Sequence, residues 1–289
     1  MLDPEAERAH HPPLRRSSMQ RSRLGQLALA SAAVLAATLA TPAIAATDSD
    51  IPTFNEFQSQ TFQDTDRQYI VNGDEPVSST GDLRAFYDSM VGSAKKGTED
   101  GLVVNTVSGR DDKWTATQAM NLTYCVSTKF GSQYTNVVNA MAAGAGQWEA
   151  ASSKVNFTHL SANDSNCTVR NNAVLFSVEP TNTTSYIARA FFPSTADRSR
   201  NVLVNAPSLM NSGSWTPSNI MAHELGHALG FRHEHTRPEA GTCFEDNNWR
   251  PLTPYDSSSI MHYPQCNGTS SNLSMTATDR QGIVALYGA

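Results

Sequence analysis

The chain of 289 residues has few cysteines, a modest charge content and no concentration of basic side chains. Only 17% of its residues are charged, and without a lysine- or arginine-rich stripe it lacks the electrostatic footprint of a nucleic-acid-binding protein. Its four cysteines lie far apart in sequence, which argues against a CxxC-type structural zinc or redox site. The hydrophobic content of 39% and the length indicate an ordinary globular protein of one or two domains.

The negative charge is concentrated in one segment. Residues 48–113 contain six basic and thirteen acidic residues, whereas residues 114–289 contain ten and eleven. The acidic segment has no cysteine and shows one helical pattern near residues 81–92. We therefore expect residues 46–113 to form a separate acidic leader and residues 114–289 to form the main domain.

An apolar run lies near the beginning of the chain. Basic residues such as Arg21 precede the Ala- and Leu-rich residues 24–40, and small residues follow up to Ala45. This order is typical of a signal peptide, predicted here over residues 1–45, rather than of a stable membrane anchor. Residues 1–18 fit an extension that is not part of the signal. We expect a protein secreted to the extracellular space or the periplasm.

Export changes the interpretation of the cysteines. An even number in an oxidising compartment predicts two disulfides, with three connectivities open. We favour Cys125–Cys167 and Cys243–Cys266, because each pair closes one local region of the chain.

The main domain shows an α+β pattern. Helical spacing covers residues 132–153, 216–230 and 277–288, and short strand patterns cover residues 120–126, 155–160, 173–180, 186–193 and 201–207. The second helix begins with Thr216 at the N-cap and Pro217 at its first position. The sequence therefore predicts a mixed sheet with helices, followed by an irregular tail.

Residues 223–235, HELGHALGFRHEH, contain four of the eight histidines. His223 and His227 are four residues apart, so they lie about 40° apart on one helix face, with Glu224 beside them. His233 would be roughly 280° round a continuous helix from His223, so the helix must end first. Gly230 permits the left-handed turn that brings the third histidine back.

Three histidines leave an open position on a zinc ion, which is the arrangement of a catalytic site. Zinc lowers the pKa of a bound water to about 7, and Glu224 is placed to take its proton during attack on a peptide carbonyl. The sequence predicts one catalytic Zn²⁺ on His223, His227 and His233, and a protein or peptide substrate.

At these residues the chain resembles the metzincin metalloproteases, whose HExxHxxGxxH motif precedes a Met-turn. Residues 258–263, SSIMHY, and residues 230–239, GFRHEHTRPE, are closest to the astacin-like group, whereas residues 277–288 resemble the end of a matrixin domain. The resemblance implies a zincin-like fold, with a twisted mixed sheet packed on two long helices. It also implies a small irregular lower subdomain with the Met-turn and a C-terminal helix.

The resemblance implies roles for three further residues. Met261 would form a hydrophobic base under the zinc ligands, and Tyr263 would be a weak extra ligand that supports the transition-state oxyanion. Glu234 resembles the glutamate that links the turn to the buried mature N-terminus. The resemblance therefore implies that the chain is a secreted, monomeric zinc endopeptidase made as a zymogen. The alternatives are an exported zinc-binding protein without catalysis and a zinc hydrolase of non-peptide amides.

The leader sequence VNGDEP, residues 71–76, loosely resembles the FxGD element with which astacin propeptides place an aspartate on the zinc, although Val71 replaces an aromatic residue. Asp74 is therefore either a latency switch or part of an ordinary Gly-Asp turn. The absence of cysteine from the leader excludes a cysteine switch. Basic residues within 95–114 predict the cleavage region.

Other polar residues near the motif have simpler interpretations. His235 and His262 are not expected to be ligands, because three histidines already satisfy a catalytic zinc. His159 is expected to be a strand residue. The run EDNN, residues 245–248, fits either a calcium site or a solvated loop, and the residues favour the loop. Residues 186–192 fit either an edge strand that pairs with substrate or a core strand.

Overall fold

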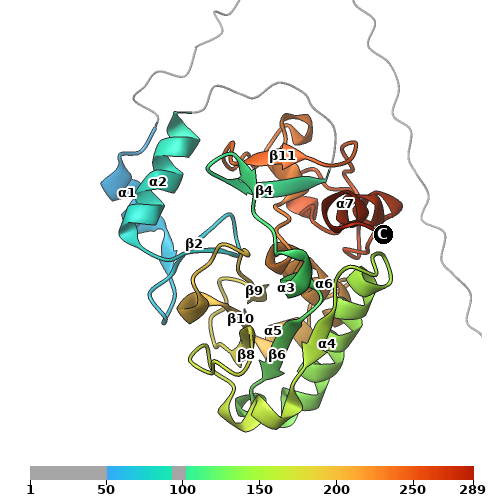
Figure 1. Ribbon diagram of the computed structural model, residues 1–289. Helices are drawn as coiled ribbons and strands as arrows, with labels where there is room; N and C mark the ends of the chain where they lie inside the picture. Colours follow the sequence, from blue (N-terminus) through green and yellow to red (C-terminus); the bar gives the residue numbers. More distant parts are fainter. Residues whose placement is uncertain (1–50, 93–101) are drawn as a thin grey trace, which may run out of the picture. The chain divides into compact units, whose positions relative to one another are not determined.

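The computed structural model describes residues 51–92 and 102–289 (Figure 1). The predicted signal peptide, residues 1–45, lies outside the described residues. The described residues belong to one compact unit with an α+β fold, as predicted. In the described residues no helix is long and apolar enough to span a membrane.

The described segments contain α-helices, β-strands and short 3-10 turns. The helices are α1 (Phe54–Gln60), α2 (Thr80–Val91), α3 (Ala116–Ala119), α4 (Tyr134–Glu149), α5 (Ala206–Met210), α6 (Pro217–Ala228) and α7 (Ala277–Tyr287). The strands are β1 (Phe62–Gln63), β2 (Tyr69–Val71), β3 (Glu75–Val77), β4 (Val103–Val107), β5 (Arg110–Asp111), β6 (Leu122–Val126), β7 (Phe157–His159), β8 (Phe176–Pro180), β9 (Ala188–Arg189), β10 (Asn201–Val204) and β11 (Trp249–Pro251).

The main sheet has five strands in the order β7-β6-β8-β10-β9. Strands β7, β6, β8 and β10 are parallel, and β9 pairs antiparallel with β10 at the edge. The predicted mixed sheet is therefore confirmed, and residues 186–192 do contain its edge strand. The neighbours of this short strand, Ala190 and Phe191, are also buried in the core, so the segment is both an edge strand and part of the core, and its pairing with substrate stays a prediction.

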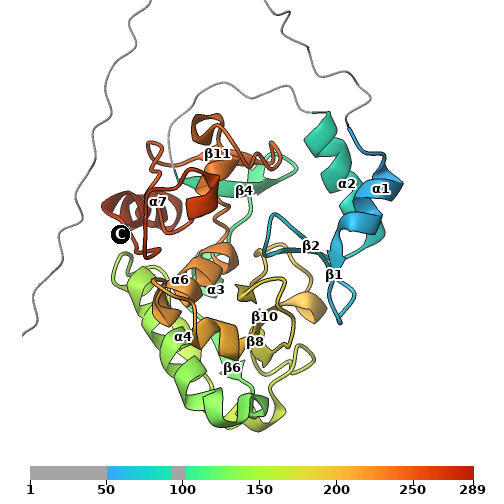
Figure 2. The same cartoon turned by 180° about the vertical axis from the view of Figure 1, so that it is seen from behind.

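Helices α4 and α6 pack against each other on one side of the sheet, and both views show them alongside (Figures 1 and 2). Trp148 of α4 donates a hydrogen bond from Nε1 to the carbonyl of Ala222 in α6, at 2.7 Å. Its ring also stacks on Phe231, just beyond the end of α6. These contacts hold the histidine-bearing helix in the centre of the core.

Helix α6 begins and ends where the sequence predicts. The Thr216 side chain accepts a hydrogen bond from the Asn219 amide, and Pro217 occupies the first turn. Gly230 has φ +102°, and a Cβ there would lie 2.1 Å from the carbonyl oxygen of Asp112. The turn therefore excludes every side chain at this position, by backbone conformation and by lack of space.

The leader is more structured than the single predicted helix. It contains α1, α2 and a three-stranded antiparallel sheet, β1-β2-β3, around a small core of Phe54, Tyr69, Val71 and Leu83. The strands were missed because they have only two or three residues each, too few to show an alternating pattern.

Residues 102–111, which the sequence assigns to the leader, are paired with the main domain. Strand β4 pairs with β11, and Leu102 lies in the main core. Lys113 donates a hydrogen bond to the carbonyl of Leu286 at the other end of the domain. The boundaries 1–45, 46–113 and 114–289 stay predictions, and the first part of the expected cleavage region, with Lys95 and Lys96, lies outside the described residues.

Both predicted disulfides are confirmed. Cys125 bonds to Cys167 and Cys243 bonds to Cys266, each with a Cα–Cα distance of 5.6 Å. The first joins β6 to the segment before β8. The second joins the loop after the third histidine of the motif to the segment that follows Tyr263.

Candidate metal centre

The three motif histidines converge on one point. His223 and His227 project from α6, and His233 returns from the turn after Gly230, so that their Nε2 atoms and a carboxylate oxygen of Asp74 all lie within 4.8 Å of one another. All four residues are buried. The structure therefore brings together the residues that the motif spacing selected, and adds a leader residue.

The other ring nitrogen of each histidine has a hydrogen-bond partner. His223 Nδ1 lies 2.6 Å from the carbonyl oxygen of Ile260, and His227 Nδ1 lies 2.8 Å from that of Phe231. His233 Nδ1 lies 2.6 Å from Glu245 Oε1. Each Nδ1 is therefore engaged by an acceptor outside the centre, which orients each ring so that Nε2 is the atom directed at the centre and available to a metal.

This donor set fits a zinc ion. The three Nε2 atoms are buried and have no hydrogen-bond partner among the described residues, which is costly unless a ligand is bound. Asp74 oxygens lie 3.3, 3.5 and 3.2 Å from the Nε2 atoms of His223, His227 and His233. Tetrahedral zinc bonds of about 2.05 Å place ligand atoms roughly 3.3 Å apart, so these separations match a fourth ligand position.

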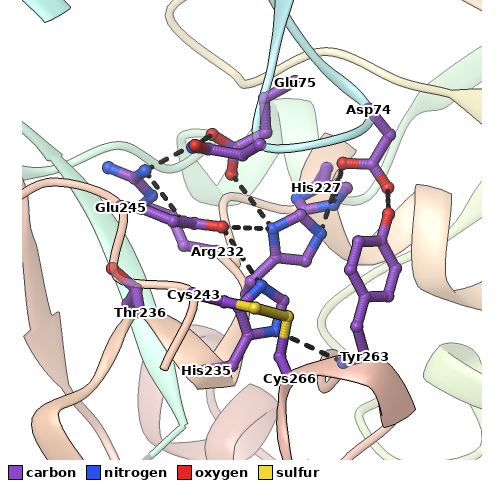
Figure 3. Close-up of polar contacts among 12 residues, drawn as sticks. Asp74, Glu75, His227, Arg232, His235, Thr236, Cys243, Glu245, Tyr263 and Cys266 are labelled. Atoms are coloured by element: carbon purple, nitrogen blue, oxygen red, sulfur yellow. Dashed lines mark hydrogen bonds and ion pairs between the residues drawn. A yellow bond between two sulfur atoms is a disulfide. The ribbon is translucent and has the colours of Figure 1, made fainter. Parts of the chain in front are cut away.

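Two proton-bearing side chains border the centre. Glu224 is buried, and burial raises the pKa of its carboxyl well above the usual value, with the Asp74 carboxylate adding to the effect. The hydroxyl of Tyr263 donates a hydrogen bond to Asp74 (Figure 3), and burial raises the pKa of this phenol as well. Both side chains, with His223, line a cavity of about 180 Å³.

Asp74 is ionised in this setting. Burial opposes the charged form, but His233 and His227 outweigh it and hold the pKa of Asp74 well below its usual value. In Figure 3 the carboxylate points between an imidazole and the ring of Tyr263. Gly73 precedes it with φ +102°. The Gly73-Asp74 turn is therefore the element that brings the Asp74 carboxylate to the histidines.

Met261 lies beneath the ligand helix, where the resemblance implies it. It is fully buried, and a Cβ at Gly226 would lie 2.5 Å from its sulfur. Its carbonyl accepts a hydrogen bond from the amide of Glu234. The Glu234 carboxylate is also buried, and burial raises its pKa. Its Oε1 accepts from the amide of Asp256, while Oε2 has no partner among the described residues.

A second carboxylate group was missed at the sequence level. Glu245 and Asp246 are buried rather than solvated, so the prediction of a solvated loop is wrong for these two residues, whereas Asn248 is exposed. Arg232 pairs with both, and also with Glu75 of the leader at 3.3 Å (Figure 3). Glu245 in turn orients His233. The arginine of GFRHEH was the available signal, since a buried cation next to a ligand histidine requires acidic partners.

The remaining histidines have local partners. His235 Nε2 lies 3.4 Å from Glu245, and His235 Nδ1 accepts from the amide of Tyr263. His262 Nε2 lies 2.8 Å from the hydroxyl of Tyr255. His159 lies in β7, 3.0 Å from Asp164. None of these three belongs to the convergent group with Asp74.

A buried histidine triad on HExxHxxGxxH, with a methionine turn beneath it, defines the metzincin class of zinc peptidases. No family model matches the chain. It is 39% identical over 71 aligned residues to high choriolytic enzymes 2 and 1 of Oryzias latipes, covering 19% of this chain and 25% and 26% of those enzymes. It is 40% identical over 63 residues to zinc metalloproteinase nas-30 of Caenorhabditis elegans, covering 15% of this chain and 8% of that protein.

The chain therefore spans about a quarter of the length of the two choriolytic enzymes that it matches. The motif, the histidine triad and these partial matches together make the chain similar to the astacin-like metzincins.

Proposed function

We propose that the chain is a zinc-dependent endopeptidase, exported and made as a zymogen. The observation that carries this proposal is the convergence of three unpartnered Nε2 atoms, each with its Nδ1 already hydrogen-bonded, beside the buried carboxylate of Glu224. Such a donor set is preorganised for a metal before the metal arrives. The name of one partial relative, zinc metalloproteinase nas-30, supports the choice of peptide bonds as substrate.

His223, His227 and His233 would hold the zinc ion. Zinc supplies a positive charge that polarises a carbonyl and makes water acidic near neutral pH. Glu224 borders the cavity and takes the proton of the attacking water, then returns it to the leaving amine. The Tyr263 hydroxyl, held now by Asp74, turns to the oxyanion of the substrate.

The leader supplies latency. Asp74 fills the fourth position around the histidines, where substrate and water would enter, and it also engages Tyr263. One carboxylate therefore blocks both the fourth ligand position of the metal and the oxyanion donor. We place the end of the leader before Leu102, because that residue and β4 are integrated into the main domain. The predicted signal sequence and the two disulfides support export.

Glu234 fits the role that the family resemblance implies. Its Oε1 pairs with Arg237, while its Oε2 is buried without a hydrogen-bond partner among the described residues, so the amino group of the matured chain would supply the missing partner. That ion pair would link the new terminus to the Met-turn, since the amide of Glu234 already bonds to Met261. Maturation and site assembly would then be coupled.

The test is hydrolysis of casein or a fluorogenic peptide by the matured chain, beside the variant Glu224→Ala, with zinc measured in both. We expect the wild type to cleave and the variant to retain zinc while losing about 10²- to 10⁴-fold in kcat. Zinc binding without cleavage in both, after leader removal is verified by mass, would instead favour a non-catalytic zinc-binding protein. Cleavage only of non-peptide amides would favour the third alternative.

A further inference from the structure

Arg189 is a buried cation beside the candidate centre that the proposed mechanism does not use. It lies in β9, at the edge of the main sheet, and its side chain is fully buried. The residue before it, Ala188, lines the cavity that Glu224 and Tyr263 border. A buried arginine needs acidic partners. Whether those partners belong to the leader or to the main domain therefore determines whether the arginine keeps them after maturation.

The acidic partners come from the leader. Arg189 Nε lies 3.1 Å from Asp64, and Nη2 lies 2.5 Å from Asp66. The hydroxyl of Tyr186 also donates a hydrogen bond to Asp64. Burial opposes ionisation of Asp66, but Arg189 and hydrogen bonds from neighbouring amides bring its pKa below the usual value. Within the described residues, both ion pairs of Arg189 are made to the leader.

The other half of the contact belongs to the main domain. Asn201 of β10 holds Arg189 Nη1 through its side-chain oxygen at 3.0 Å, and Tyr186 comes from the segment just before β9. Ile70 of the leader packs against Tyr186 and Leu203 next to the ion pairs. The side chains of the main domain are thus fixed at the sheet edge, while the acidic side chains that they bind lie on the leader, which maturation would remove.

We propose that Arg189, Asn201 and Tyr186 form a recognition site for an acidic side chain of the substrate. This inference rests on the proposed function, since it requires that the leader depart. Asp64 and Asp66 occupy the site in the precursor. When the leader is removed, the positive charge of Arg189 is left without an acidic partner. An edge strand pairs readily with an extended peptide, and a carboxylate on that peptide would restore the lost ion pairs.

The distance to the chemistry is short enough to affect cleavage. Asp64 and Asp66 precede Asp74 by ten and eight residues, and all three make contacts with the main domain. A substrate segment that follows the path of the leader would therefore meet the arginine within ten residues of its scissile bond. Its apolar residues would meet Tyr186 and Leu203, as Ile70 does.

The experiment compares fluorogenic peptides in which one aspartate is moved stepwise through ten positions on either side of the scissile bond. Each peptide has a twin with asparagine at the same position. The matured full chain, Arg189→Gln and a control, Arg280→Gln on the exposed surface of α7, are assayed in parallel. We expect the wild type and the control to prefer aspartate at one position by roughly tenfold in kcat/KM, and Arg189→Gln to lose the preference.

A second measurement does not need cleavage. A peptide of residues 62–71 labelled with a fluorophore should bind the matured chain, and Asp64→Asn with Asp66→Asn in that peptide should weaken binding by about tenfold. Equal binding of both peptides, or equal aspartate preference in the wild type and Arg189→Gln, would overturn the inference. If no peptide is cleaved but the binding difference is found, the proposed function fails while the acidic site stands.

Discussion

The leader bundle, residues 51–92, has its own core of four buried apolar side chains, whereas the main core in the rest of the described chain holds 36. The main domain is also crosslinked by both disulfides, and the leader contains no cysteine. Buried apolar area is the principal source of folding free energy. The two parts thus differ strongly in their capacity to remain folded alone.

The contacts between the two parts are of a different kind from those within each. Leader carboxylates meet cationic or histidine groups at three places: Asp64 and Asp66 at Arg189, Asp74 at the histidines, and Glu75 at Arg232. In the described part of the chain, Ile70 adds a small buried apolar cluster with Tyr186 and Leu203, and the exposed ring of Phe62 meets Tyr186 edge-on. A leader attached mainly by buried charge pairs can be held firmly and yet depart into water without exposing a large apolar surface.

The largest expected effect comes from removing the central charge. In the purified, uncleaved precursor, Asp74→Ala leaves three histidines and Tyr263 without their leader partner, and breaking such a buried pair costs about 3–5 kcal/mol. We expect residual peptidase activity of the precursor to rise by roughly 100-fold or more. Asp88→Ala, on the exposed face of α2, is the control. Equal latency of both precursors would show that Asp74 only forms a turn.

The small core of the leader allows a test of whether the leader unfolds independently of the main domain. Leu83 is fully buried in it, and Leu83→Ala should cost about 2–5 kcal/mol, a large share of what so small a core supplies. We expect protease sensitivity within residues 51–92 and partial activity, with thermal unfolding of the main domain unchanged. Val91→Ala, an exposed truncation on the same helix, should have neither effect. A single transition shifted as a whole would mean that the parts unfold together.

The third prediction concerns the main domain and the Glu245 carboxylate that orients His233. Glu245→Gln keeps the size of the side chain but replaces a charged acceptor of His233 Nδ1–H with a neutral one. We expect zinc affinity of the matured chain to fall about 10- to 100-fold, measured by competition with a chelator. Glu149→Gln, which alters a carboxylate on α4 that accepts from a backbone amide, is the control. Unchanged affinity would reduce Glu245 to a packing role.

Acid should weaken the leader contact slightly. The pKa of Asp66 is lower in the folded precursor than its ordinary 3.8, so its contribution to stability is present above 3.8 and is lost as the pH falls below that value. Leader release, followed by the anisotropy of a label on residues 51–92, should therefore increase below about pH 4 in the wild type and less in Asp66→Asn. The same pH dependence in both would assign the effect to other groups.

Much of the site could be predicted because the motif encodes its own geometry. The four-residue spacing of His223 and His227 fixes one helix face, and Gly230 marks the only place where the chain can turn toward His233. Thr216 and Pro217 similarly determine where α6 begins. These features depend on neighbours within about ten residues, which a single sequence displays.

What could not be predicted depends on residues far apart in the chain. Glu245 was interpreted as part of a solvated loop because nothing near it in sequence shows that Arg232 folds back to meet it. The ion pairs of Arg189 connect residues more than 120 positions apart, and no periodicity reports such a pair. The leader strands are too short for alternation to show. Ion pairs between residues far apart in the chain, and strands of two residues, can be recognised only in the folded structure.

The Cys243–Cys266 disulfide has a consequence for the order of assembly. Cys243 lies two residues before Glu245, and Cys266 lies three residues after Tyr263, so the bond ties the carboxylate that orients His233 to the segment that carries the phenol. Before oxidation that tie is absent, and the carboxylate has more freedom to leave the imidazole. We expect metal uptake to follow oxidation rather than precede it. If the chain is exported as proposed, the ion would then be loaded only after the chain has left the reducing cytosol, so that the proposed peptidase would not be active there.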